Sequence, residues 1–262
     1  WGQDGPLATT AGHDIDYIAL SGTLHSIGEA KRPVPPLNLV GDFGGGGMML
    51  AMGVLAGVFA VSAGATRQVV DAAMVDGSAL LASMQFSEMA AGRWESRRET
   101  NLLDGGAPFY TTYQTSDGHH MAVGALEPQF FEALLDGLSI ERSEIPPQGD
   151  RVGWPLMREV FAARFAEATR EQWTTRFEGS DACVTPILSL SEAPKHPHNI
   201  ERSTFLPFGE AVQPHPAPRF SATPTDLPQL PPAPGANTDS VMTGLGYSPD
   251  QVVMLRRAGA IA

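Results

Sequence analysis

The sequence is short of cysteine and of positive charge, and each shortage excludes a class of protein. Cys183 is the single cysteine in 262 residues, so no internal disulfide can form and a reducing, cytoplasmic location is expected. Lys and Arg together number 17 against 29 Asp and Glu, which gives a net charge of −12. Because binding to a phosphate backbone needs a surplus of cations, we expect no nucleic-acid partner.

The start of the chain also lacks the features of a targeting signal. The sequence begins at Trp1, and residues 1–6 read as a turn with no charged segment and apolar core before them. We therefore expect no signal peptide, and we expect these residues to be the C-terminal portion of a longer protein.

One long uncharged run, residues 43–66, raises the question of a membrane. The run is long enough to span a bilayer, and Gly53 and Gly57 have the GxxxG spacing. However, it begins with glycines and lacks flanking Trp/Tyr or Lys/Arg clusters. A helix buried on all sides in an α/β protein gives the same pattern, and we favour that interpretation, with no membrane partner. A membrane-inserted segment is the alternative.

The first 92 residues alternate between helix-like and strand-like segments. The pattern predicts a helix over about 12–27, a short strand or loop over 37–42, a glycine-led helix, a buried strand over 68–76 and a helix to about residue 92. This order predicts an α/β fold, in which residues 1–92 form the C-terminal part of a large domain with a doubly wound parallel sheet.

The composition changes after residue 92. Residues 93–107 are a predicted linker, and 108–190 are a predicted small α+β domain. Within that domain, Asp117-Gly118 predicts the turn of a hairpin, and Pro128 predicts the first turn of a helix. Residues 191–262 are predicted to form a Pro-rich return followed by short C-terminal helices.

Most familiar catalytic motifs are absent from the sequence. It has no GxSxG elbow, no GxxxxGK[ST] loop, no CxxC pair and no pair of histidines with helical metal-ligand spacing. Cys183 is interpreted as a buried apolar residue rather than a nucleophile. His13, at a predicted helix start, and Asp42, before the glycine run, remain. Ligands of doubly wound folds bind at such positions, although each residue alone is explained as well by helix capping.

Long motifs are spread over nearly the whole chain. They are WGQDGP at 1–6, GHDIDY at 12–17, PPLNLVGDFGGG at 35–46, QVVDAAMVDG at 68–77, LDGGAP at 103–108, GALEPQF at 124–130, SDACVTP at 180–186 and PAPRFS at 216–221. Together they closely resemble the α-methylacyl-CoA racemases of the family III CoA-transferase (CaiB/BaiF-type) superfamily.

The resemblance implies an isomerase of lipid metabolism that inverts the α-carbon of 2-methylacyl-CoA thioesters by two-base proton transfer through an enolate. It implies that His13 and Asp42 are the acid/base groups and that Glu127 orients His13. It also implies supporting roles for Tyr17 and Asn38. It implies no metal or redox cofactor, since CoA belongs to the substrate.

Three further residues are expected to bind the substrate. The Asp14 N–H, at a helix start, is expected to receive the charge of the enolate oxygen. Gly44 and Gly45 are expected to let the backbone approach the acyl chain closely.

The resemblance also implies an interlocked homodimer in which Glu127 comes from the other subunit. The family has an N-terminal stretch that supplies the first strands and most contacts to the CoA nucleotide. Since that stretch does not match here, we expect low activity from these residues alone.

Two alternatives from other classes remain open. In a family III CoA-transferase, Asp42 would be the nucleophile that forms an acyl anhydride, although the GHD segment with His13 favours the racemase. The other alternative is an inactive fragment or binding module.

Overall fold

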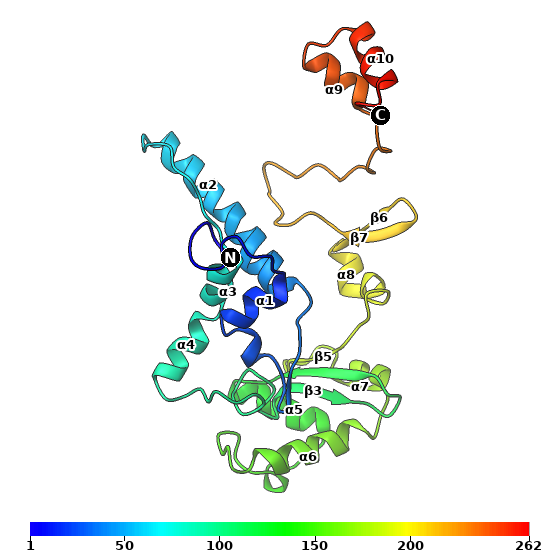
Figure 1. The fold of residues 1–262 in the computed structure, drawn as a ribbon. Coiled ribbons are helices and arrows are strands. Elements are labelled where there is room, and N and C mark those ends of the chain that lie inside the picture. Colours follow the sequence, from blue (N-terminus) through cyan, green and yellow to red (C-terminus); the bar gives the residue numbers. More distant parts are fainter. Residues whose placement is uncertain (262) are drawn as a thin grey trace. The chain divides into compact units, whose positions relative to one another are not determined.

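The computed structural model describes residues 1–261 and divides the chain into two compact units, Trp1–Ile187 and the residues from Leu188 onward (Figure 1). The fold is mixed α/β. The finer predicted division at residues 92, 107 and 190 is not tested by this two-part split and stays a prediction.

The first part of unit 1 is helical. Its elements are α1 (Asp14–Leu20), the 3₁₀ helix η1 (Leu24–Ser26), strands β1 (Gly28–Glu29) and β2 (Arg32–Pro33), the π-helix η2 (Leu39–Met48), α2 (Met49–Ser62), α3 (Met74–Leu81) and α4 (Ser83–Ala90). Glycine allows η2 to pack directly on α3. A Cβ at Gly77 would lie 1.8 Å from the Gly45 carbonyl oxygen, and one at Gly45 would lie 2.6 Å from the Ser78 nitrogen. The glycine run therefore serves backbone-to-backbone packing of these two helices.

The strand predicted over 68–76 is wrong, and the segment over 37–42, predicted as a short strand or loop, contains no strand. Residues 37–42 run from a turn into the start of η2. Residues 68–73 are irregular, and α3 begins at Met74. All strand pairs among the described residues are antiparallel, in sheets of two, three and two strands. The predicted doubly wound parallel sheet is therefore not confirmed. A parallel strand needs a neighbouring strand to satisfy its backbone, and no such neighbour lies beside these described segments.

Two predicted helices have other bounds than expected. The helix predicted over 12–27 ends at Leu20, where the Ser21 hydroxyl donates to the Ile18 carbonyl at 3.1 Å and Gly22 takes a φ of +83°. The helix predicted from Gly77 begins earlier, at Met74, and is interrupted at Ala82 between α3 and α4.

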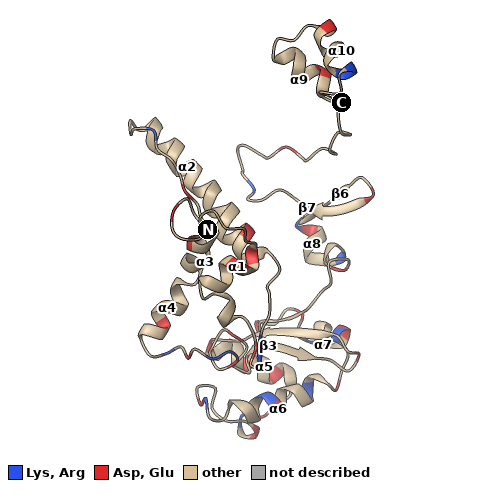
Figure 2. Ribbon diagram, viewed as in Figure 1, with Lys and Arg blue, Asp and Glu red and all other residues tan. Residues whose placement is uncertain are grey.

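Helix α2 is exposed, so the prediction of burial on all sides is wrong for this chain. None of its residues is buried, and the side chains of Leu55 and Phe59 are 71% and 76% exposed. Figure 2 shows α2 without a charged residue along its length. The helical stretch Leu39–Ser62 has the length and composition of a membrane span, and 11% of its most apolar window is buried. Gly53 has a local explanation, because a Cβ there would lie 2.7 Å from the Val70 side chain.

The second part of unit 1 is a three-stranded antiparallel sheet in the order β3 (Tyr110–Gln114), β4 (His120–Gly124) and β5 (Val184–Pro186). The predicted hairpin is present: β3 pairs with β4 with Tyr113 opposite Met121, and Gly118 in the turn has a φ of +78°. The other elements are α5 (Pro128–Leu138), the 3₁₀ helix η3 (Arg142–Glu144), α6 (Trp154–Phe165) and α7 (Arg170–Phe177).

The hydrophobic core of unit 1 lies between this sheet and its helices. Helix α5 begins at Pro128, as predicted, and buries Phe131, Leu134, Leu135 and Leu138, which share one face at helical spacing. Burying each such side chain contributes about 1.5–3 kcal/mol. The same core holds an aromatic cluster, in which Tyr113 stacks on Phe165 with ring centroids 5.0 Å apart.

The second unit has little buried surface. Its elements are the 3₁₀ helix η4 (Ala193–Lys195), α8 (Pro197–Glu201), the antiparallel strands β6 (Phe205–Phe208) and β7 (Ala211–Pro214), and helices α9 (Thr238–Gly244) and α10 (Pro249–Arg257). Residues 217–236 between β7 and α9 are exposed and rich in proline. Proline lacks an N–H to donate, which keeps this stretch out of sheets and helices.

Candidate active site

The carboxylate of Asp14 joins the two segments that carry His13 and Asp42. The Asp14 side chain is 7% exposed, and its Oδ2 accepts the Asp42 backbone N–H at 2.7 Å. This approach requires glycine next to Asp42, because a Cβ on Gly41 would lie 2.6 Å from Asp14 Oδ2. The backbone of Asp42 is therefore one hydrogen bond away from the residue that follows His13 in the chain.

His13 is the N-cap residue of α1 and is exposed. Its backbone N–H donates to Asp16 Oδ2 at 3.0 Å, which closes the first turn of the helix. Its ring Nδ1 lies 2.8 Å from the Gly12 carbonyl oxygen. Because a carbonyl can only accept, Nδ1 of the neutral ring carries the proton and Nε2 keeps its lone pair. Exposed and with that lone pair free, Nε2 has the properties of a general base.

Asp42 lies in the first turn of η2 and is partly buried. Its Oδ2 accepts a hydrogen bond of 3.2 Å from the side-chain amide of Asn38, the N-cap residue of the same helix. Asn38 is thus placed to orient the carboxylate. The predicted supporting residue and the predicted acid/base residue touch directly in the structure.

Tyr17 is buried about one helical turn after Asp14, on the same face of α1. Its ring meets Trp1 edge-on, with centroids 4.6 Å apart and planes at 74°. Trp1 in turn covers Gly12, where a Cβ would lie 2.9 Å from the indole ring. Trp1 and Tyr17 therefore fix the backbone whose carbonyl holds the His13 ring. Sequence reasoning did not assign Trp1 to the site, because its contact with Gly12 and Tyr17 joins residues that are distant in the chain.

Gly44 and Gly45 face helix α3 rather than an open cavity. A Cβ on Gly44 would lie 3.0 Å from Leu81 Cδ1, and Gly45 lies against Ser78. The structure accounts for both glycines by packing, and their contact with an acyl chain stays a prediction.

Glu127 lies in the small sheet domain as the exposed N-cap residue of α5. Among residues 1–261, no hydrogen bond joins it to His13, whose ring contacts Gly12 instead. The hydrogen bonds of one chain therefore link the segments of His13, Asp14, Asn38 and Asp42, and the role of Glu127 stays a prediction.

Cys183 is exposed, so the prediction that it is buried is wrong. It follows buried Ala182 with a left-handed φ of +53°, a backbone turn that leaves the side chain outside the core. Partial desolvation, followed by the negative charges of Glu127 and Asp181, raises the pKa of its thiol. A thiol kept protonated in this way is a poor nucleophile near neutral pH.

The part of the chain that the structure describes contains no cluster of side chains that could bind a metal ion. No three His, Cys, Asp or Glu side chains there gather closely enough to hold an ion. The chemistry offered at the α1–η2 junction is that of one imidazole and one carboxylate, which can each take or give a proton.

Known proteins share both the sequence and the fold. The chain is 45% identical over 258 residues to alpha-methylacyl-CoA racemase of Mus musculus and 44% identical over 259 residues to that of Homo sapiens. These matches cover 97% of this chain and 68% of each racemase. A CAIB/BAIF family protein from Brucella suis has a similar fold, with a TM-score of 0.73 and 18% identity over 94% of this chain and 66% of that one.

The matched residues span both parts of unit 1. Residues 1–238 match the model of CoA-transferase family III, a range that includes the α1–η2 junction and Glu127. On this match and the identity to the two racemases, the chain belongs to CoA-transferase family III.

Proposed function

We propose that this chain carries the acid/base half of an α-methylacyl-CoA racemase, an isomerase that inverts the carbon next to the thioester carbonyl of 2-methylacyl-CoA substrates. The observation that carries the proposal is the hydrogen bond from the Asp42 N–H to the Asp14 carboxylate, which holds the His13 and Asp42 segments together. The names and the 44–45% identity of the two mammalian relatives support it.

Inversion requires a proton to leave one face of the α-carbon and another to arrive on the opposite face. In our proposal His13 Nε2 takes or gives the proton on one face and Asp42 serves the other. The Gly12 carbonyl holds the His13 tautomer that leaves Nε2 unprotonated, and Asn38 orients the Asp42 carboxylate. General acid/base groups placed in this way contribute about 10²–10⁴ in rate.

The intermediate is an enolate, and its oxygen needs a hydrogen-bond donor. We assign this role to the Asp14 N–H, which is at the first position of α1 and has no carbonyl within the helix to bind. A preorganised donor of this kind typically accounts for about 10²–10³ in rate.

Further parts of the proposal concern the surroundings of the site. The chain spans 68% of the length of the racemases, so contacts to the CoA nucleotide are proposed to come from the part that it does not match. We propose a homodimer in which Glu127 of one subunit orients His13 of the other. Proton transfer needs no electron carrier, and we propose no cofactor beyond the CoA of the substrate. We also propose a cytoplasmic location.

The test is inversion and deuterium uptake at C2 of each enantiomer of a 2-methylacyl-CoA in heavy water. The variants His13→Ala and Asp42→Ala are each expected to lower inversion by about 10²–10⁴, because each removes the proton carrier of one face. If one variant still takes up deuterium at C2 of one enantiomer, and the other variant at C2 of the opposite enantiomer, each residue serves one face of the α-carbon. The matched controls are His119→Ala and Asp226→Ala, which change exposed residues that are distant in sequence from His13 and Asp42. Unchanged inversion in both site variants overturns the proposal.

A CoA-transferase is the second candidate, and the description of the matching family favours it. In that reaction the Asp42 carboxylate attacks the acyl carbonyl, an anhydride forms and the CoA thiolate leaves. Trapping of the acyl group on Asp42 by hydroxylamine, with no inversion at C2, would select this function over the racemase.

A further inference from the structure

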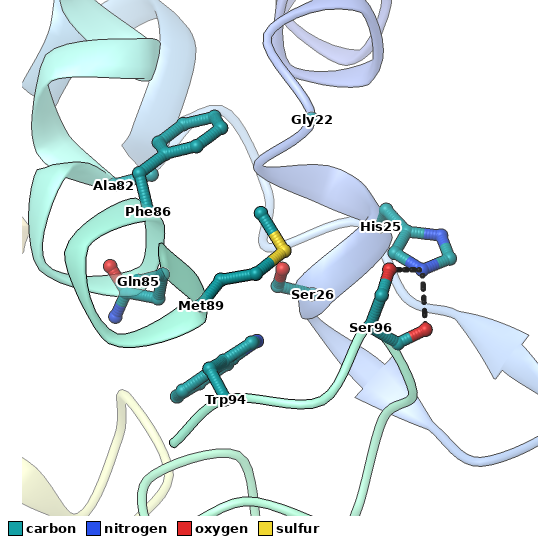
Figure 3. Close-up of a pocket in the computed structure, with 9 residues that line it drawn as sticks. All are labelled: Gly22, His25, Ser26, Ala82, Gln85, Phe86, Met89, Trp94 and Ser96. Carbon is teal, nitrogen blue, oxygen red and sulfur yellow. Dashed lines mark hydrogen bonds between the residues drawn. The ribbon is translucent and has the colours of Figure 1, made fainter. Parts of the chain in front are cut away.

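A cavity of about 200 Å³ opens beyond the end of α1 that is remote from His13. Figure 3 shows its walls, which come from the turn after α1, from η1, from α4 and from the chain that follows α4. The residues that line it are Gly22, His25, Ser26, Ala82, Gln85, Phe86, Met89, Trp94 and Ser96.

The lining is apolar where α4 and the following chain face the cavity. Met89 reaches into the space between Phe86 and Trp94 (Figure 3). A thioether between two aromatic rings is polarisable and flexible, so it adapts to alkyl groups of different shape.

The other side of the cavity carries polar groups, and two of its residues, His25 and Ser96, contact each other. His25 Nε2 lies 3.3 Å from both the carbonyl oxygen and the hydroxyl of Ser96. An alkyl group entering the cavity therefore need not break a strong hydrogen bond to a buried charge. The lining surface is mostly apolar, which matches an alkyl group.

Two elements lead from the candidate active site to this cavity. Helix α1 starts beside His13, rises about 10 Å over its length, and is followed by Gly22 in the cavity wall. On α3, Leu81 lies against Gly44 and the next residue, Ala82, lines the cavity.

A hydrogen bond between the turn after α1 and α3 fixes the position of the cavity relative to the candidate active site. The Thr23 hydroxyl donates to the Ser78 carbonyl at 3.0 Å. This ties the turn after α1 to α3, and α3 also packs against Gly45 of η2. The distance from site to cavity is thus set by packed backbone rather than by mobile side chains.

We propose that this cavity receives the distal end of the alkyl chain of the acyl-CoA and so sets the preferred chain length. The inference rests on the proposed function. Each methylene that the cavity takes out of water is expected to raise kcat/KM about fourfold, up to the length at which the cavity is full. Chains too short to pass from His13 along α1 gain nothing from it.

The test compares a short and a long 2-methylacyl-CoA, the long one with about ten carbons in its chain so that it spans α1. The variant Ala82→Leu fills the cavity and is expected to lower the long-to-short ratio of kcat/KM at least about tenfold. Ala90→Leu is the matched control, because it makes the same change on α4 at an exposed residue outside the cavity, and it is expected to leave the ratio unchanged.

A second variant covers the case in which Ala82→Leu fails to fold. Met89→Ala enlarges the cavity and is expected to move the optimum to longer or bulkier chains. An unchanged chain-length profile in a folded, active variant overturns this inference and leaves the racemase proposal intact. Absence of inversion with every chain length in a wild-type protein that also carries the N-terminal part of the racemases overturns both.

Discussion

Among single residues, Asp14 shows how one carboxylate organises the candidate site. Its side chain is buried, one oxygen accepts the Asp42 N–H, and the other is buried without a partner among the described atoms. Burying a carboxylate with one unpaired oxygen costs stability, which is typical of a residue kept for function. The sequence pointed to the Asp14 N–H, whereas the structure adds a positioning role for its side chain.

The Asp14→Ala variant is expected to lose about 1.5–3 kcal/mol of stability, because the buried Asp42 N–H loses its acceptor. The inversion rate should fall at least about tenfold, because the Asp42 carboxylate moves with its backbone. Asp14→Asn keeps an oxygen that accepts the same N–H, and it is expected to retain most of the stability and most of the inversion rate. Denaturant unfolding and C2 inversion measure the two effects. Equal inversion rates for the Ala and Asn variants would contradict a positioning role.

The buried side chain of Tyr113 predicts how the stability of the fold depends on alkaline pH. Its buried hydroxyl donates to the Pro108 carbonyl at 2.6 Å, and burial raises its pKa, with Arg158 opposing weakly. The folded state keeps the proton while an unfolded tyrosine ionises near pH 10. The free energy of unfolding should therefore begin to fall as the pH rises above about 10, since the unfolded state then binds fewer protons.

Tyr113→Phe is expected to lower the free energy of unfolding by about 0.5–1.5 kcal/mol at pH 8 and to make its decline above pH 10 shallower. Urea unfolding followed by tryptophan fluorescence between pH 8 and about 11 measures both. The partly exposed Tyr110→Phe is the matched control, whose alkaline slope should equal that of the wild type. A Tyr113→Phe slope as steep as the wild-type slope would show that other groups cause the decline.

At the scale of elements, α2 separates what hydropathy can predict from what it cannot. The uncharged run predicted a helix, and Met49–Ser62 is one. Because apolar residues lie on every side of this helix, the sequence also predicted that it is buried on all sides. The described residues bury none of its side chains fully. An exposed apolar patch of this kind favours association with another surface.

Replacing Leu55 and Phe59 with Gln should reduce self-association of this chain, because both side chains are mostly exposed in α2 and lie one helical turn apart. The stability of the fold should change by less than about 0.5 kcal/mol per substitution. Sedimentation velocity measures the association, with Leu190→Gln, exposed outside the helix, as control. A large loss of stability with unchanged association would show that α2 is covered in solution.

At the scale of the whole molecule, the two units differ in how much they bury. The large hydrophobic core lies between Ala107 and Val184, in unit 1, and all four tryptophans are also in that unit. The stretch 217–236 of the other unit is exposed and Pro-rich, which leaves it open to proteases.

Limited digestion with chymotrypsin is expected to cut first after Phe220, whose side chain is 56% exposed. The remaining fragment should keep the tryptophan fluorescence and the cooperative unfolding of the intact chain, since its core is complete. Phe220→Ala removes the cleavage site and serves as control. An early cut within Trp1–Ile187, or loss of the fluorescence signal, would contradict this division.

The sequence by itself determined the features that depend on residues close together in the chain. It determined the turn at Asp117-Gly118 and the start of α5 at Pro128, because both follow from local backbone preferences. It also carried the motifs around His13 and Asp42 that identify the family. The strand predicted at 68–76 was wrong, since a short apolar run becomes a strand only when another strand lies beside it.

The tertiary structure alone decided how these motifs meet. The Asp42 N–H contacts a carboxylate 28 residues earlier, Gly45 packs on the backbone of Gly77, and the cavity beyond α1 is closed by α4 and Trp94. Each of these contacts joins residues far apart in sequence, so no local propensity determines it. Their geometry depends on how whole helices pack, because backbone segments can approach this closely only where every side chain between them is absent.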